Sequence, residues 1–255
     1  MNDIFEEGCA PVCFFDSGIG GLTLLHECVK RLPDKKFIYF ADNYNVPYGN
    51  YICEQLLKKV DAIFSQIAEF NPSAAVIACN TVTAQCAAYL REKYSFPIIG
   101  IQPAIKPAAA SARRCVVLAT PATAASSSVK ELVERFGRGV TEVIACRELA
   151  SYIESNIFNL SEQSIFEMLP EVDTDTVVLG CTHYVYIKDY VKAKYCCPIF
   201  DGLEGTAKHL CNILGDVENN QKILNADVKF IGGDEEKNEK VFKSLFFPKK
   251  AGSEK

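Results

Sequence analysis

The sequence predicts an α/β protein with two pseudo-symmetric α/β domains, each with a mostly parallel sheet and with the active site in the cleft between them. Nine short apolar runs, continuous rather than alternating and rich in valine and isoleucine, indicate strands buried on both faces. Amphipathic segments separate these runs, and such alternation of strand and helix favours parallel sheets. Two of the runs end alike, in ACNT at 78–81 and in GCTH at 180–183, which favours two similar halves.

The expected elements follow in chain order. The strands are expected at 12–16, 36–42, 74–80, 97–101, 115–120, 142–146, 176–182, 198–202 and 228–233. Apolar residues at helical spacing over 22–32 and 56–67 predict amphipathic helices after the first two strands. The charge run GDEEKNEK at 233–240 indicates a solvated helix start, with acidic residues favourably placed near its N-terminus.

The domain limits follow from the positions of the two cysteine strands in different halves of the chain. Cuts near Ile99 and Gly205 place 1–98 together with 206–255 in a first α/β domain and 99–205 in a second. In open parallel sheets, ligands bind beyond the carboxyl ends of the strands. Two such domains that face each other would place the two cysteines on opposite walls of one cleft.

Composition limits the classes of function. The chain has 255 residues, 27 Lys and Arg against 32 Asp and Glu, and a net charge of −5, which argues against a nucleic-acid or membrane partner. The start of the sequence lacks the pattern of a signal peptide and no segment has the length of a membrane span, so the cytoplasm is expected. With 12 cysteines but three histidines and no CxxC, most cysteines are expected to be reduced core residues, with no metal site.

The segment FFDSGIGGLTLL places Asp16 and Ser17 at a strand end, before a glycine turn and a helix. Glycines permit close backbone approach, and a helix N-terminus attracts an anion, so a carboxylate or phosphate could bind here. Neither GxGxxG nor a Walker A loop is present, and a plain strand-turn-helix junction stays an equal alternative. After the second strand, Tyr48 and Gly49 lie in a turn where each could donate a hydrogen bond, although this motif by itself favours an ordinary loop.

The paired cysteines, Cys79 and Cys181, carry more information. A thiol has a pKa of about 8.5, which a helix N-terminus or a positive neighbour lowers. Two weak acids on opposite walls can remove a proton from one face of a carbon and return one to the other face.

Together, FFDSGIGGLT, ADNYNVPYG, ACNT and GCTHY, in this order and at this spacing, resemble the bacterial glutamate racemases of the aspartate/glutamate racemase superfamily. The resemblance spans about residues 11 to 245. It implies cofactor-independent interconversion of L- and D-glutamate, which supplies D-glutamate for peptidoglycan and hence for the cell wall and cell shape. It also implies a small-molecule substrate, no cofactor and no metal, and a homodimer.

The resemblance also assigns roles to residues. It implies that Cys79 and Cys181 are the two bases and that Asp16, His183 and, less directly, Glu154 assist them. It implies that a second group holds the substrate carboxylates and ammonium: Ser17, Tyr48, Gly49, Asn80, Thr81, Thr120, Thr123 and Thr182. The sequence departs from the family pattern at Val82, Thr83, Val185 and Gln102, none of them a proposed catalytic group.

Three alternatives stay open at this stage. An aspartate racemase would share the chemistry, although FDSGIGG and PYG favour the glutamate branch. A cysteine hydrolase or amidase could use Cys181 with His183 to form an acyl-enzyme, but it would leave the matched strand of Cys79 without a purpose. A two-lobed amino-acid binder without catalysis is commonly exported, and the sequence carries no export signal.

Overall fold

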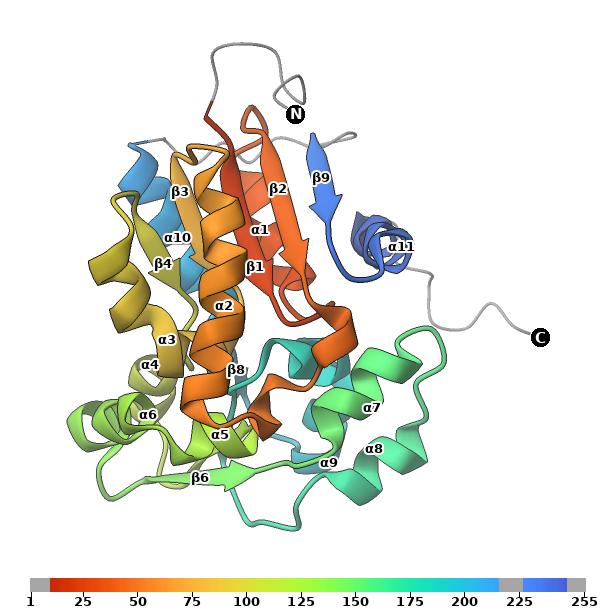
Figure 1. The fold of residues 1–255 in the computed structure, drawn as a ribbon. Coiled ribbons are helices and arrows are strands. Elements are labelled where there is room, and N and C mark those ends of the chain that lie inside the picture. Colours follow the sequence, from red (N-terminus) through yellow and green to blue (C-terminus); the bar gives the residue numbers. More distant parts are fainter. Residues whose placement is uncertain (1–9, 216–226, 247–255) are drawn as a thin grey trace.

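The computed structural model describes residues 10–215 and 227–246, which form two α/β units stacked one above the other (Figure 1). Residues 1–9, on which the expected lack of a signal peptide partly depends, lie outside the described part, as does Cys9. In the described part, no helix is long and apolar enough to cross a membrane.

Within the described residues, nine strands form two wholly parallel sheets, so the predicted α/β class is confirmed. The first sheet has the order β4-β3-β1-β2-β9 and the second β6-β5-β7-β8. The strands are β1 (Val12–Asp16), β2 (Phe37–Ala41), β3 (Ala74–Ile77), β4 (Ile98–Gly100), β5 (Cys115–Ala119), β6 (Thr141–Ala145), β7 (Thr176–Leu179), β8 (Ile199–Phe200) and β9 (Val228–Ile231). The last strand, β9, pairs with β2 and so belongs to the first sheet. The limits of the two domains along the chain stay a prediction.

Helices connect and cover the strands. The α-helices are α1 (Leu22–Arg31), α2 (Cys53–Ala68), α3 (Asn80–Lys93), α4 (Ile105–Ala109), α5 (Pro121–Ala125), α6 (Ser127–Leu132), α7 (Leu149–Asn156), α8 (Glu162–Met168), α9 (Lys188–Tyr195), α10 (Leu203–Leu214) and α11 (Glu235–Phe246). Short helical turns complete the set: η1 (Asn43–Asn45), η2 (Tyr48–Asn50), η3 (Val133–Gly137) and η4 (Thr182–Ile187).

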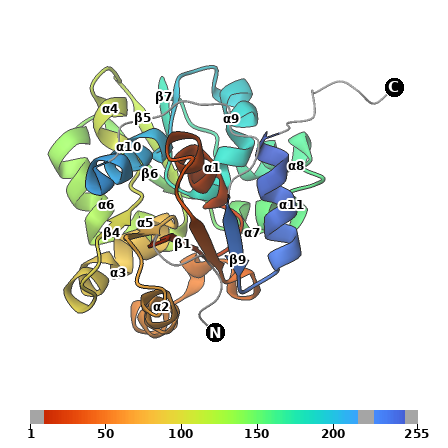
Figure 2. The ribbon, with the colours of Figure 1, turned by 90° about the horizontal axis from the view of Figure 1, so that it is seen from above.

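Both faces of the first sheet are buried, as the continuous apolar runs predict. Alternate residues of β1 enter different cores: Val12 and Phe14 pack with α1, α10 and α11, whereas Cys13 and Phe15 pack with α2 and α3. Figure 2 shows these helices on opposite sides of the sheet. The second sheet likewise has one core toward α7 and α9 and another toward α4 and α6.

The two cysteine strands end earlier than expected. Strand β3 stops at Ile77 and β7 at Leu179, so that Cys79 and Cys181 lie just beyond the pairing region. Each cysteine is the residue before a helical segment: Cys79 precedes α3, and Cys181 precedes the turn η4 that leads into α9. The strands of the first sheet point toward the second unit, which brings these ends together (Figure 1).

Candidate active site

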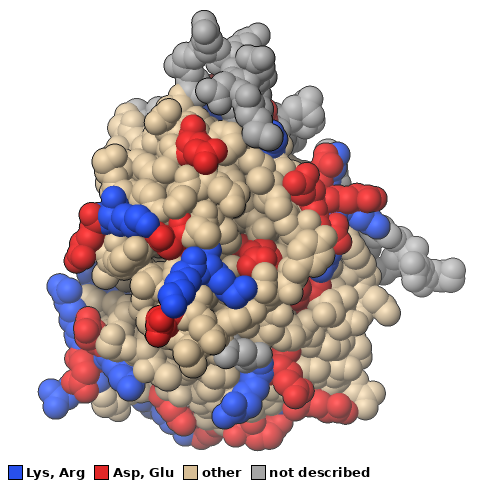
Figure 3. All heavy atoms as spheres, in the orientation of Figure 1, with Lys and Arg blue, Asp and Glu red and all other residues tan. Residues whose placement is uncertain are grey.

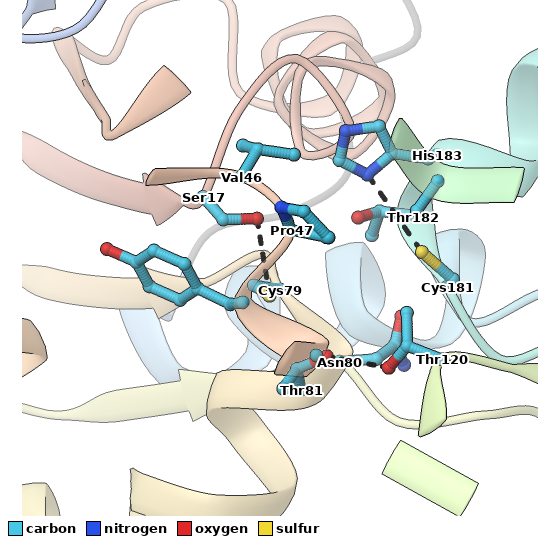
Figure 4. Close-up of a pocket in the computed structure, with 13 residues that line it drawn as sticks. Ser17, Val46, Pro47, Cys79, Asn80, Thr81, Thr120, Cys181, Thr182 and His183 are labelled. Carbon is cyan, nitrogen blue, oxygen red and sulfur yellow. Dashed lines mark hydrogen bonds between the residues drawn. The ribbon is translucent and has the colours of Figure 1, made fainter. Parts of the chain in front are cut away.

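A pocket lies between the ends of the two sheets and contains residues from both units (Figure 4). Most of the residues that the sequence suggested line it: Ser17, Tyr48, Gly49, Cys79, Asn80, Thr81, Thr120, Cys181, Thr182 and His183. Cys79 and Cys181 face the pocket from different sides, and their exposed fractions are 6% and 7%. The site therefore presents two nearly dry thiols to one enclosed space.

Cys79 stands at the N-terminus of α3, where the first backbone N–H groups have no partner within the helix. The hydroxyl of Ser17, at the end of β1, lies 3.8 Å from its sulfur. Burial, followed by the negative charge of Asp16, raises the pKa of the Cys79 thiol, although an N–H from Val82 and the Ser17 hydroxyl oppose this shift. The thiol form is therefore favoured at Cys79 when the pocket is closed and empty.

Cys181 is the first member of a chain of contacts within the second unit. Its sulfur lies 3.9 Å from Nδ1 of His183, and Nε2 of that ring lies 2.7 Å from Oε2 of Glu154 in α7. Burial alone would lower the pKa of His183, but the contacts with Cys181 and Glu154 outweigh burial and raise it well above its usual value. Burial likewise opposes ionisation of Glu154, yet the bond from His183 and further donors lower its pKa to about 2.

This geometry favours one distribution of protons. Glu154 is ionised at neutral pH and accepts the Nε2–H of His183, so Nδ1 is directed to the sulfur of Cys181. A protonated His183 can therefore donate from Nδ1 toward the sulfur of Cys181. The two walls of the pocket are thus unlike, with an imidazole and a carboxylate behind Cys181 and a serine hydroxyl beside Cys79.

The glycine turn after β1 binds a carboxylate, but one that belongs to the protein. The N–H of Ile19 donates to Oε2 of Glu154 at 2.9 Å, and the N–H of Gly18 donates to Oδ1 of Asp16 at 2.8 Å. A β-carbon on Gly18 would lie 2.3 Å from Oε2 of Glu154, so a side chain there would displace it. The turn is therefore a contact between the two units, which neither of the two sequence-based alternatives described.

Asp16 is fully buried behind the pocket and does not line it. Its Oδ2 accepts a bond from the hydroxyl of Thr182 at 3.3 Å, which links the end of β1 to the end of β7. Burial raises the pKa of Asp16 to about 7, while the positive charge of His183 acts in the opposite direction. Asp16 acts on the pocket through Thr182 and, when ionised, through its charge.

Three threonine hydroxyls form a triangle across the cleft. Thr81 of α3 lies 3.0 Å from Thr120 and 3.1 Å from Thr123, and Thr120 and Thr123 are 2.9 Å apart. A hydroxyl has one proton and two acceptor sites, so these groups can turn to donate to an incoming anion. Thr123 is fully buried behind the other two and is absent from the pocket lining.

Tyr48 and Gly49 line the pocket, and the hydroxyl of Tyr48 has a partner within the protein. It donates to Oδ2 of Asp42 at 2.6 Å, and Asp42 does not line the pocket. Gly49 approaches Thr120 so closely that a β-carbon there would lie 3.0 Å from its Cβ. The close approach explains why glycine suits this turn.

Other residues were missed by the sequence analysis. Val46, Pro47 and Ala150 line the pocket, and apolar residues of this kind carry no distinguishing signal in a sequence. Lys237, within the charge run that was expected to be solvated, instead donates to Glu154 at 3.1 Å, and its neighbour Asn238 is fully buried. The expectation of a purely solvated helix start was therefore wrong for these two positions, because α11 packs against the active-site end of β9.

Among the described residues, no group of three or more His, Cys, Asp or Glu side chains is arranged to hold a metal ion. All described cysteines are free thiols. On the face shown in Figure 3, positive and negative side chains are interspersed rather than gathered by sign.

Comparison with known proteins now identifies the family. The model of the Asp/Glu/hydantoin racemase family matches residues 23–210. The chain belongs to this family. Among its racemase relatives, the glutamate racemase of Lachnospira eligens is 40% identical over 185 residues, 69% of this chain and 70% of that protein. The glutamate racemase of Clostridium novyi is 34% identical over 87% of this chain and 97% of its own length.

Solved racemase structures have the same architecture. Escherichia coli glutamate racemase, in complex with L-glutamate and the activator UDP-MurNAc-ala, superposes with a TM-score of 0.79 at 29% identity, covering 93% of this chain and 95% of that one. The RacE1 glutamate racemase of Bacillus anthracis has a TM-score of 0.74 at 29% identity, with 92% of each chain covered. The predicted resemblance is confirmed, and this racemase is an isomerase with two α/β domains.

Proposed function

We propose that the protein interconverts L- and D-glutamate by a two-base mechanism in which Cys79 and Cys181 exchange protons with opposite faces of the α-carbon. The observation that carries this proposal is the placement of the two thiols, from different sheets, on different sides of one buried pocket. L-Glutamate as the ligand of the Escherichia coli relative supports the choice of substrate. Both steps are proton transfers between a thiol and the α-carbon, and the proposed reaction uses no cofactor.

The first step depends on which thiol begins as the thiolate. With Cys181 as thiolate beside protonated His183, its sulfur removes the α-proton of the enantiomer that presents hydrogen to that wall. The thiol of Cys79 then gives its proton to the opposite face. This exchange leaves Cys181 as thiol and Cys79 as thiolate, which is the state that accepts the mirror-image substrate.

The α-proton is far less acidic than a thiol, so the site must stabilise the carbanionic transition state more than bound glutamate. Donors at the N-terminus of α3, with Asn80, Thr81 and the hydroxyl of Thr182, lie where the α-carboxylate would meet them. Donors that are held in place in a dry site cost no reorganisation during the reaction. The triangle of Thr81, Thr120 and Thr123 provides a second set for the other carboxylate.

Substrate entry requires the walls to separate. Asn80, Thr81, Thr182 and His183 are each no more than 4% exposed, so the closed pocket admits no ligand from solvent. Relative motion of the two domains would open it and break the contacts that cross the cleft, such as that of Thr81 with Thr120.

The decisive experiment uses purified protein with L-glutamate in deuterated water, without added cofactor. The α-proton signal should disappear from the NMR spectrum while D-glutamate accumulates toward equal amounts of both enantiomers. An unchanged signal from folded, reduced protein would contradict the proposal, and the same test with aspartate separates the two racemase specificities.

One observation favours a second candidate, hydrolysis by a cysteine nucleophile. The thiol of Cys181 contacts the imidazole of His183, which contacts the carboxylate of Glu154. Acyl-transfer sites place a nucleophile, a base and an orienting carboxylate in this way. Hydrolysis would release ammonia from an amide substrate and would need no thiol on the far wall. Exchange at the α-carbon without ammonia release would decide for racemisation.

The role in the cell follows from the product. We place the enzyme in the cytoplasm as a homodimer whose D-glutamate supplies peptidoglycan synthesis, and hence cell shape. Restored growth of a bacterium that requires D-glutamate, on expression of this chain, tests that role, and light scattering of the purified protein tests the dimer.

A further inference from the structure

We infer that Lys237 and Asn43 are positioning residues for the Glu154–His183 pair, so that helix α11 and the loop after β2 hold a carboxylate of the opposite domain in place. The inference deepens the proposed function and rests on it. Neither residue lines the pocket. Both act on the reaction through Glu154 and His183.

The carboxylate of Glu154 has four donors, divided equally between its two oxygens. Oε2 accepts from Nε2 of His183 at 2.7 Å and from the N–H of Ile19 at 2.9 Å. Oε1 accepts from Nδ2 of Asn43 at 2.8 Å and from Nζ of Lys237 at 3.1 Å. Three of these four donors belong to the other domain, and the side chain of Glu154 is 7% exposed.

Lys237 donates to Glu154 at two positions. Besides its bond to Oε1, its ammonium donates to the main-chain oxygen of Glu154 at 2.6 Å. The cation thus spans the backbone and the carboxylate of one residue, which restricts both the position of α7 and the rotation of the side chain. Its side chain is 22% exposed, so part of the lysine stem is covered although it stands in a charged run.

Asn43 is itself held in one orientation. Its Oδ1 accepts bonds from the N–H of Asp234 at 3.1 Å and from Nδ2 of the buried Asn238 at 3.0 Å. Because its oxygen is occupied by donors, its amide nitrogen must face Glu154 and Oδ1 of Asn238. The start of α11 therefore fixes both donors to Oε1, one directly and one through Asn43.

The consequence concerns the imidazole of His183. If Oε1 loses its donors, the carboxylate can rotate about its terminal bond and the ring loses a fixed partner at Nε2. The direction of Nδ1 toward Cys181 then becomes less well defined, and proton transfer at that wall slows. Substrate contacts are unaffected because Lys237 and Asn43 do not reach the pocket.

The experiment compares full-length variants at saturating and limiting concentrations of each glutamate enantiomer. Lys237→Met removes the ammonium and keeps the methylene chain, Lys237→Arg keeps a cation, and Asn43→Asp replaces the amide donor by a carboxylate of the same shape that repels Glu154. Lys243→Met is the matched control, since Lys243 is on the same helix with a side chain that is 70% exposed. A downfield imidazole N–H proton, assigned by its loss in His183→Asn, reports on the ring directly, and three histidines make the assignment simple.

We expect Lys237→Met and Asn43→Asp to lower kcat by about 10- to 100-fold in both directions, as losses of partners behind reacting groups commonly do, with KM changed less than about twofold. Lys237→Arg should recover most of the lost kcat, and the imidazole proton should shift in Lys237→Met but not in Lys243→Met. Unchanged kcat and an unchanged imidazole proton in Lys237→Met would overturn the inference. A rise in KM alone, or equal losses in Lys237→Met and Lys237→Arg with an unmoved proton, would do so too.

A failure of the proposed function itself looks different. If the parent protein turns over neither enantiomer, racemisation is refuted. The imidazole proton still tests whether Lys237 positions His183, because that signal requires no substrate.

Discussion

Gly20 lies directly against His183: a β-carbon on Gly20 would be 2.6 Å from Nδ1 of the imidazole and 2.5 Å from Oγ1 of Thr182. Such distances are shorter than any ordinary contact, so the glycine permits the first domain to touch the two active-site residues of the second. The surface where the domains meet is thus also the wall of the pocket. Substitutions that move Gly20, His183 or Thr182 at this contact should therefore change the rate of catalysis.

Gly20→Ala should reduce kcat/KM about 100-fold, because the added methyl must push His183 or Thr182 away from its place, and a displacement of about 1 Å can have this effect. Gly205→Ala is the matched control. Gly205 lies in α10 with no atom within 4 Å of an added β-carbon, and alanine there should raise the free energy of unfolding by about 0.5–1 kcal/mol. Steady-state kinetics with thermal unfolding of both variants provide the measurement, and full activity in Gly20→Ala would contradict the close contact.

Cys79→Ser and Cys181→Ser should each lower kcat/KM by about 10²- to 10⁴-fold, since a hydroxyl is a much weaker acid than a thiol and replaces one of the two proton-transfer groups. The two enantiomers have equal free energies in water, so the loss in kcat/KM must be the same in both directions for each variant. A difference between directions can appear only in kcat and KM taken separately. Progress curves from both enantiomers, followed by circular dichroism, measure these values.

Cys53→Ser is the control for the cysteine variants, because Cys53 is exposed at the start of α2 and does not line the pocket. It should leave both rates unchanged. Full racemase activity in Cys79→Ser, with its fold intact, would contradict the two-base proposal. A role for Cys181 as a nucleophile could then still be tested.

Asp16 should make the protein less stable as pH rises from about 4 to about 7. Its pKa in the folded protein is about 7, above the value of about 3.9 for an unfolded chain, so the folded state binds this proton more tightly. Stability is therefore greatest below the unfolded pKa and falls until pH passes the folded pKa, by up to about 4 kcal/mol. Asp16→Asn cannot ionise and should gain stability relative to the parent protein across this range.

Midpoints of thermal unfolding between pH 4.5 and pH 8 measure this effect. The difference between Asp16→Asn and the parent should grow with pH, whereas Asp34→Asn, at an exposed position, should follow the parent throughout. Parallel curves for the parent and Asp16→Asn would show that Asp16 is not held in its neutral form.

Much of the fold could be predicted because its signals are local. All five residues of β1 are buried, and the four consecutive apolar residues Val12 to Phe15 show this directly in the sequence. Cys79 and Cys181 were recognisable because the same short pattern follows two strands, and the ends of parallel strands gather at one edge of a sheet. Where the strands stop was less predictable, since Cys79 extends the apolar run but precedes the first turn of α3.

The sequence by itself determined the α/β class, the paired thiols and the family resemblance, because each depends on residues that are close together along the chain. Only the tertiary structure decided what surrounds Glu154, whose donors Ile19, Asn43 and Lys237 lie 135, 111 and 83 residues away. The tertiary structure also turned the glycine loop from a possible anion site into a contact between domains, and a charged helix start into a partner of the active site. The physical reason is that hydrogen bonds and close packing depend on distance in space, and the order of residues along the chain does not record which distant side chains the fold brings together.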